Sequence, residues 1–183
     1  MEKISKNVLK LNVDSNVYLI NKSIVIDTGP KNYKDIVRKE LSNIAGLDKI
    51  KKVVFTHLHM DHIGNFDLFA KSEFYASKEE IDDFKKMPLR CVLDPFLAKR
   101  FNAELNPLYE LEGFRIIKTP GHTRGSICLL YEKEKILFSG DTLFFNGQIG
   151  RLDLFTSAPK KMDESLRKLE KLDYDILAPG HDY

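Results

Sequence analysis

All five histidines of this chain fall into one spacing pattern that is typical of a metal centre. Three of them lie in the segment Thr56-His-Leu-His-Met-Asp-His62, while His122 and His181 each follow a Pro-Gly pair. Asp61 within that segment and Asp141 in Ser-Gly-Asp-Thr add two carboxylates. Seven nitrogen and oxygen donors exceed the needs of one zinc ion, since structural zinc takes four ligands and catalytic zinc usually three plus water. The pattern therefore predicts two metal ions in a shared site, with hydrolytic or redox chemistry.

Most of these donors follow directly after short runs of strand-forming residues. Residues 17–20 and 23–26 predict a hairpin with a tight turn at Asn21-Lys22. Open α/β sheets gather their binding loops beyond the ends of strands, so we expect the donors to meet at one edge of a sheet. The runs and the residues that follow them are 23–26 before Asp27, 52–55 before His57, 114–117 before His122, 135–138 before Asp141 and 175–178 before His181.

Two stretches between the strands have the apolar spacing of amphipathic helices. One stripe runs through residues 33–44 and a second through residues 162–172. Ser157 is the expected N-cap of the second helix, with Pro159 in its first turn. Each half of the chain thus contains strands, a helix and metal donors, which predicts two similar layers packed together in a single domain spanning residues 1–183.

Residues 78–111 form the least regular part of the chain. Residues 78–86 predict a charged helix that ends at Met87-Pro88, and residues 90–104 predict a second helix interrupted by Pro95. An excursion of this kind between strands often covers a site. A plain structural insertion is the alternative, and the sequence leaves both open.

The composition restricts partners and location. A formal net charge of +2 offers no electrostatic argument for a nucleic-acid or membrane partner. No apolar run approaches the roughly 18 residues that a membrane-spanning helix needs, and residues 1–8 lack the apolar region of a signal peptide, so we expect a cytoplasmic protein. Cys91 and Cys128 lie outside every metal motif and are expected to be ordinary buried thiols.

The spacing inside the first motif has a physical logic. His57 and His59 are two residues apart, so both imidazoles can point the same way from an extended turn. Asp61 and His62 follow a bend and can address a second ion, and Asp141 is the candidate bridge. A structural zinc site would normally include thiolates, and neither cysteine is near the motif.

The ordered set of motifs resembles that of the metallo-β-lactamase superfamily, from Asp27-Thr-Gly29 to Pro179-Gly-His181. The resemblance implies an α/β fold of four layers, an αβ/βα sandwich with two mixed sheets face to face and a dinuclear site at one edge. It also implies that Asp27 orients a ligand histidine, with a turn or cap role as the alternative. By the family pattern, the first metal is held by His57, His59 and His122, the second by Asp61, His62 and His181, and Asp141 bridges them.

Within the superfamily the chain is most similar to the glyoxalase II branch, the hydroxyacylglutathione hydrolase-like proteins. Phe138-Ser-Gly-Asp-Thr-Leu-Phe144, followed by Gly150-Arg151, resembles a stretch of that branch, as does the segment 119–126. True β-lactamases of the superfamily generally lack an aspartate at position 141. The chain ends two residues after His181, so the C-terminal helical domain with which glyoxalase II holds glutathione is expected to be absent and the thiol carrier stays open.

The substrate contacts are left unassigned by these motifs. The segment 78–111 is a candidate replacement for the missing pocket wall. Arg151 and Asp153 are expected to form an ion pair that holds the loop after Asp141. The loose candidates for substrate contacts, for which a plain surface position is the favoured alternative, are Arg90, Lys99, Arg100 and Tyr109.

The resemblance implies a dinuclear hydrolase acting on a small-molecule thioester or ester. A hydroxide bridging two divalent ions, with zinc expected and iron or manganese as alternatives, would attack the carbonyl carbon, with Asp61 and Asp141 as the catalytic carboxylates. The main alternative is a persulfide dioxygenase-like oxidoreductase with one iron held by the residues matching His57, His122 and Asp141. A lactonase, another ester hydrolase and a non-catalytic metal-binding module are further alternatives. The oligomeric state is left open.

Overall fold

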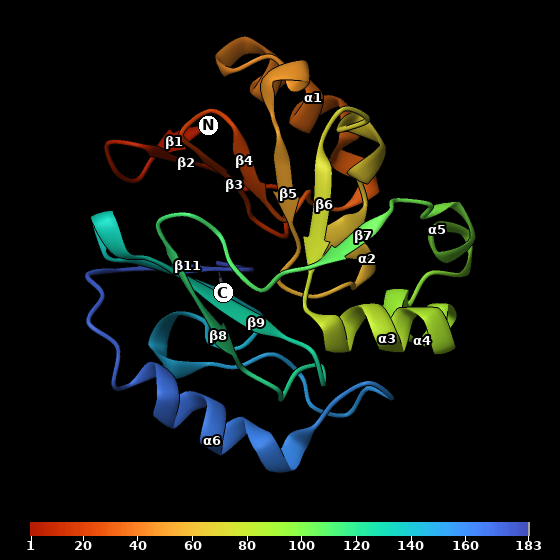
Figure 1. The fold of residues 1–183 in the computed structure, drawn as a ribbon, viewed down its shortest axis with the longest axis vertical. Helices are drawn as coiled ribbons and strands as arrows, with labels where there is room; N and C mark the ends of the chain where they lie inside the picture. Colours follow the sequence, from red (N-terminus) through yellow and green to blue (C-terminus); the bar gives the residue numbers. More distant parts are fainter. Residues whose placement is uncertain (183) are drawn as a thin grey trace.

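A computed structural model describes residues 1–182 as two β-sheets that face each other, with helices on the outside (Figure 1). The larger sheet has seven strands that follow one another in chain order, antiparallel from β1 to β4 and parallel from β4 to β7. These strands are β1 (Glu2–Lys3), β2 (Val8–Leu11), β3 (Val17–Ile20), β4 (Ile24–Ile26), β5 (Lys52–Val54), β6 (Glu73–Ala76) and β7 (Leu105–Pro107).

The smaller sheet is built from the second half of the chain in the order β11-β10-β9-β8. Its strands are β8 (Phe114–Lys118), β9 (Ile127–Tyr131), β10 (Ile136–Gly140) and β11 (Ile176–Pro179). Only the pair β10 and β11 is parallel, which brings the two chain segments that follow these strands to the same edge. The α-helices are α1 (Lys34–Ile44), α2 (Met60–Ile63), α3 (Lys78–Lys86), α4 (Pro88–Val92), α5 (Pro95–Arg100) and α6 (Pro159–Leu169).

Alternation along the strands produces the layers. In β3, Val17 and Leu19 belong to the apolar cluster that includes α1, whereas Tyr18 and Ile20 belong to the cluster between the two sheets. Neighbouring side chains of a strand point to opposite faces, so both faces of β3 are buried. In the smaller sheet, Leu130 of β9 packs in the cluster that includes Leu169 of α6. Helix, sheet, sheet and helix therefore follow one another, which confirms the four-layer αβ/βα sandwich.

The expected hairpin and helices are confirmed with small shifts at their ends. Asn21 and Lys22 have φ of 49° and 56° and are the central residues of a turn in which Ser23 N–H donates to the backbone oxygen of Ile20 at 3.1 Å, with a twist that suits antiparallel strands. Helix α6 begins at Pro159, but its N-cap residue is Ala158 and no side chain caps it. The prediction of Ser157 as N-cap was wrong because its hydroxyl donates instead to the backbone oxygen of His122 at 2.7 Å.

The segment 78–111 contains three helices and a strand. The expected helix over 78–86 is confirmed as α3, whereas the single helix expected over 90–104 was wrong. Leu93 adopts the left-handed conformation with φ of 65° and ends α4. Asp94 then caps α5 by accepting from the backbone N–H of Phe96 and Leu97 at 2.7 and 2.8 Å. Pro95 is at the first turn of α5, a position that suits proline, so it starts a helix rather than interrupting one.

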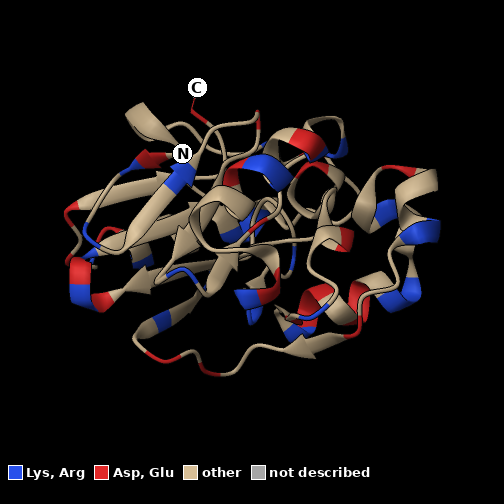
Figure 2. Cartoon of the chain, turned by 90° about the horizontal axis from the view of Figure 1, so that it is seen from above, with Lys and Arg blue, Asp and Glu red and all other residues tan. Residues whose placement is uncertain are grey.

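Strand β7 pairs in parallel with β6, so the excursion also supplies the edge strand of the larger sheet. In the cartoon of Figure 2, positions of Lys and Arg are interspersed with positions of Asp and Glu. Within residues 1–182, no helix combines the length and apolar character needed to cross a membrane.

Cys91 and Cys128 are both buried and free, as expected from their sequence positions.

Candidate metal centre

The seven candidate donors come together where strands of both sheets end. The segment 56–62 leaves β5 of the larger sheet and runs into the short helix α2, which contains Asp61 and His62. His122 lies in the connection from β8 to β9 of the smaller sheet, and Asp141 and His181 follow the parallel strands β10 and β11. Both sheets therefore contribute to one site, as the positions of the donors beyond the strands predicted.

Two glycines allow the backbones to approach this closely. Gly140 has a φ of +50°, and a Cβ at this position would lie 2.7 Å from the Cβ of Thr56. A Cβ at Gly180 would overlap the carboxylate of Asp141. A larger residue at either position would push one strand end away from the other donors.

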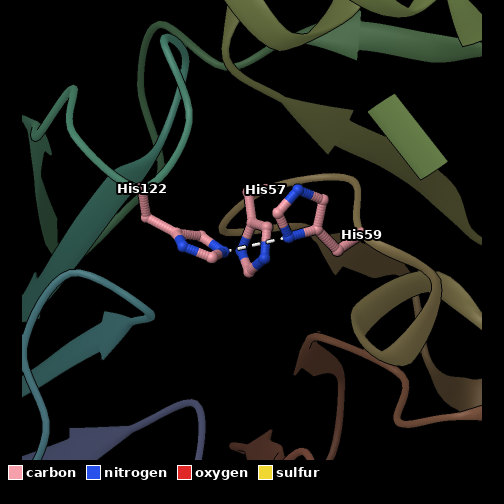
Figure 3. Close-up of side chains that lie close together, drawn as sticks. All are labelled: His57, His59 and His122. Carbon is pink, nitrogen blue, oxygen red and sulfur yellow. Dashed lines mark hydrogen bonds between the residues drawn. The ribbon is translucent and has the colours of Figure 1, made fainter. Parts of the chain in front are cut away.

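The donor atoms form three overlapping groups. The first group is His57 with His59 and His122, the second is Asp61 with His62 and His181, and the third is His57 with His62 and Asp141; within each, the atoms lie within 4.8 Å of one another. Figure 3 shows the rings of the first group pointing toward one another, with His122 approaching from the opposite side to His59. Nδ1 of His59 and Nε2 of His122 are 2.9 Å apart.

Asp27 orients one of these imidazoles. Its Oδ2 lies 2.8 Å from Nδ1 of His62, and its carboxylate also accepts from the backbone N–H and the hydroxyl of Thr56 at 2.9 and 2.8 Å. Asp27 is buried and has a φ of 54°, a conformation that aspartate tolerates better than most residues. The bond to Nδ1 turns Nε2 of His62 toward the other donors.

Backbone carbonyls orient two further rings in the same way. Nδ1 of His122 lies 2.8 Å from the backbone oxygen of Arg151, and Nδ1 of His181 lies 3.0 Å from that of Asp14. A carbonyl can only accept, so in each ring Nδ1 carries the proton and donates. When such a ring is neutral, Nε2 is the unprotonated nitrogen that can bind a metal.

Several polar atoms at the centre have no hydrogen-bond partner although they are buried. They are Nε2 of His57 and His59, and also Nε2 of His62 and Oδ1 of Asp141, which lie 3.2 Å from each other. Buried polar atoms are almost always hydrogen-bonded, and a cluster of orphans that are all good metal donors fits a pair of divalent ions. Imidazole nitrogen and carboxylate oxygen suit zinc, iron and manganese between them.

The first group of donors is held neutral by its surroundings. Burial lowers the pKa of His57 well below its ordinary value, and the neighbouring histidines lower it further. Burial and the nearby His122 lower the pKa of His59 to about 3. Burial also lowers the pKa of His122. All three rings are therefore in the metal-binding form at neutral pH.

Asp61 belongs to the second group and Asp141 lies beside it. These carboxylates reverse the effect of burial on the pKa values of the histidines. Burial opposes protonation of His62, but Asp141, Asp27 and Asp61 together raise its pKa well above the ordinary value. Burial likewise opposes protonation of His181, and the hydrogen bond with Asp61 prevails and raises its pKa. Burial would raise the pKa values of Asp61 and Asp141, yet the adjacent histidines lower both. These carboxylates are therefore ionised at neutral pH.

Glu80 is a functional-site residue that the sequence analysis missed. Its side chain is buried and accepts from the backbone N–H of Leu58, between His57 and His59, at 3.2 Å. It also accepts from the hydroxyl of Thr123, next to His122. Glu80 thus joins the loops that carry the first group of donors. The signal Ser77-x-x-Glu80 is that of a helix capping box, and it gives no hint of this longer connection.

The expected ion pair of Arg151 and Asp153 is confirmed, with two contacts of 2.8 Å. It holds the backbone whose oxygen orients His122.

A hollow beside the donors is open to solvent, and none of the four loose candidates for substrate contacts is among its lining residues. That lining consists of Asp14, His59, Asp61, Leu93, His122, Asp141, Phe144, Ile149, Gly150, Arg151, Leu154 and His181.

Fold and donor cluster together define a metal-binding hydrolase fold. Residues 12–181 match the family model of the metallo-beta-lactamase superfamily. The chain belongs to this superfamily.

Three relatives illustrate where the chain lies within the superfamily. A probable metallo-hydrolase of Methanocaldococcus jannaschii is 35% identical, over 95% of this chain and 92% of the relative. A hydroxyacylglutathione hydrolase of Francisella tularensis subsp. novicida is 31% identical, over 74% of this chain but half of the relative's length. Among solved structures, TTHA1623 in a di-iron-bound form has a TM-score of 0.73 and 26% identity, covering 96% of this chain and 92% of the other.

Proposed function

We propose that this protein is a dinuclear metal-dependent hydrolase that cleaves a thioester or a related activated ester. The position of Asp141 carries the proposal. Its Oδ2 lies 3.5 Å from Nε2 of His122 and 3.6 Å from Nε2 of His181, and its Oδ1 lies 3.2 Å from Nε2 of His62. Asp141 therefore lies near His122 of the first group and near His62 and His181 of the second group, as a carboxylate that bridges two metal ions does.

The donor groups suggest how two ions would be held. His57, His59 and His122 would hold the first, and Asp61, His62 and His181 would hold the second, with Asp141 shared. The neutral rings of the first group and the carboxylates of the second suit divalent cations. Zinc is the proposed metal because these donors and this coordination suit it, and iron is the alternative in view of the di-iron-bound relative.

When bound, the ions would lower the pKa of a water molecule and polarise the substrate carbonyl. The chain itself positions the reactants. Asp61 lines the hollow and its side chain is 27% exposed, so its ionised carboxylate can accept a hydrogen bond from the entering water. Arg151, tied to Asp153, keeps its backbone oxygen on His122. The water oxygen forms the new C–O bond, the C–S bond breaks, and the products are a carboxylate, a thiol and one proton.

The described residues around the hollow include no hydroxyl, thiol or amine nucleophile. Among the described residues, no Ser, Cys, Lys or Tyr lines the hollow. Burial raises the pKa of Cys91 to about 12 and that of Cys128 to about 11, so neither thiol forms the reactive thiolate near neutral pH. A thiolate leaving group is a weak base, which fits a site without a spare general acid. Attack by water therefore needs no covalent intermediate on the protein.

Hydrolysis of S-lactoylglutathione and of acetyl-coenzyme A by zinc-loaded protein tests the proposal. We expect thioester cleavage that follows metal content, and Asp141→Asn is expected to lose more than the roughly 10–100-fold typical of a lost outer hydrogen bond. Asp173→Asn is the matched control, because Asp173 pairs with Lys135 at the surface. Protein that binds two ions but cleaves neither these two thioesters nor octanoyl-N-acetylcysteamine, or that consumes oxygen with glutathione persulfide instead, would refute thioester hydrolysis.

A further inference from the structure

A groove continues from the metal centre toward the helices of the segment 78–111. The hollow beside the donors and a second hollow share Asp14 and Asp61 in their linings. The second hollow extends over Met60 of α2 to Phe96 and Leu97 of α5. A molecule whose reacting carbonyl lies among the donors can therefore extend along this groove.

The groove exposes large apolar side chains to solvent. Met60, Leu93 and Ile149 are each exposed by 36% or more, and Phe96 by 79%. These four residues line one or other of the two hollows. Exposed apolar side chains gathered at one place, next to a reactive centre, mark a binding surface rather than ordinary scatter.

The apolar walls are built by fixed backbone rather than by loose loops. The left-handed turn at Leu93, the cap by Asp94 and Pro95 in the first turn of α5 hold Leu93 and Phe96 in place. Outside the lining of the two hollows, the guanidinium of Arg90 lies 4.6 Å from the ring centre of Phe155. This cation–π contact joins α4 to the loop that precedes α6.

The charges of the groove disfavour a strongly anionic occupant. Within the described part of the chain, the cations lining the two hollows, apart from histidine, are Lys31 and Arg151, and Arg151 is paired with Asp153. The carboxylates of Asp14 and Asp94 lie in the same linings. A phosphate-rich carrier would need several cations here, whereas an uncharged chain would need none.

We propose that this groove binds the apolar acyl group of the substrate, so that the enzyme prefers thioesters of medium-length fatty acyl or aryl acyl groups to those of short or hydroxylated acyl groups. The proposal rests on the hydrolase function proposed above. Leu93, Phe96 and Met60 remove the acyl group from water, while the carbonyl carbon lies at the metal centre and the thiol part points to solvent.

The test compares acyl thioesters of N-acetylcysteamine, a small neutral thiol, from acetyl through butyryl and hexanoyl to octanoyl. Burial of one methylene corresponds to a factor of about 4 in binding, so kcat/KM is expected to rise roughly two- to fourfold per added methylene until the groove is filled. Phe96→Ser is expected to lower the octanoyl-to-acetyl ratio of kcat/KM by about tenfold. Tyr109→Ser is the control, since Tyr109 is 74% exposed and lines neither hollow.

Calorimetric binding of octanoate, butyrate and acetate to the zinc-loaded protein separates the groove from the reaction. Affinity that rises with chain length and falls in Phe96→Ser supports the groove even if no thioester is cleaved, in which case only the hydrolase proposal fails. Thioester cleavage with a flat chain-length profile that Phe96→Ser leaves unchanged would overturn the groove proposal alone. A dimer in sedimentation equilibrium that Phe96→Ser dissociates would also overturn it, because a second copy would then cover the groove.

Discussion

Replacement of Glu80 by glutamine is expected to change how the stability of the protein depends on pH. Burial raises the pKa of Glu80 from 4.5 to about 7, although the hydrogen bonds from Thr123 and Leu58 partly oppose the shift. In the unfolded chain the carboxyl ionises near its ordinary value. The stability that the raised pKa of Glu80 contributes to the folded protein is therefore fully present below about pH 4.5. It is lost as pH rises through about 7.

The size of the effect follows from the difference between the two pKa values. A shift of about 2.5 units corresponds to about 3 kcal/mol when it is fully expressed, and about 2.5 kcal/mol of this falls between pH 5 and pH 8. Glutamine cannot ionise, but its amide can still accept from Leu58 and donate to Thr123. Glu80→Gln should therefore gain about 2.5 kcal/mol in the free energy of unfolding, relative to the wild type, between pH 5 and pH 8.

Urea denaturation of both proteins at pH 5 and pH 8 measures this difference, after treatment with a chelator so that metal release does not contribute. Glu79→Gln is the neighbouring control. Glu79 is partly exposed and pairs with Lys118 at the surface, so its replacement should change stability by less than about 1 kcal/mol at either pH. An equal stability difference between Glu80→Gln and the wild type at the two pH values would refute the assignment of a buried, titrating carboxyl.

Three further expectations concern the donors and the core. Asp27→Asn should weaken zinc binding roughly 10–100-fold, because the ring of His62 loses its orienting carboxylate; competition with a chromogenic chelator measures this, and unchanged affinity would contradict it. Acidification should release the ion of the second group first, since the pKa values of His62 and His181 are raised whereas those of the first group are lowered; metal content along a pH series checks the order. Phe138→Ala should cost about 3–5 kcal/mol of unfolding free energy, because the fully buried ring packs against Tyr18 between the sheets; a loss below 1 kcal/mol in urea denaturation would show that the packing there is not tight.

The donor set was predictable because its information is local. His57, His59 and His62 share one short motif, and their spacing limits which atoms can meet. His122 and His181 were each weak signals alone, and their combination with the motif of His57, His59 and His62 made them candidate donors, with the strands before them predicting a shared sheet edge. The fold was expected from the family resemblance of the same motifs, and the alternation of β3 side chains between two buried clusters accounts for its layers physically.

Other parts depend on contacts between distant segments, which no local pattern records. Glu80 has the spacing of a helix cap, yet its carboxyl reaches Leu58 and Thr123 across the site. Strand β7 is three residues long and exists through its pairing with β6. Pro95 was expected to interrupt a helix. Instead, α4 ends at the left-handed Leu93, and Pro95 lies in the first turn of the next helix, α5. The proposed groove depends on the turn at Leu93, so the sequence indicated the segment 78–111 as a candidate pocket wall but not which of its residues line the groove.

The number of metal ions bound per chain tests the central claim most directly. Elemental analysis of the purified protein, saturated with zinc and freed of loosely bound metal, should give two ions per chain. Two ions are expected because His57, His59 and His122 form one group, Asp61, His62 and His181 form another, and Asp141 lies within 3.6 Å of histidines of both. A single ion per chain at saturation would contradict the dinuclear centre and favour a mononuclear site.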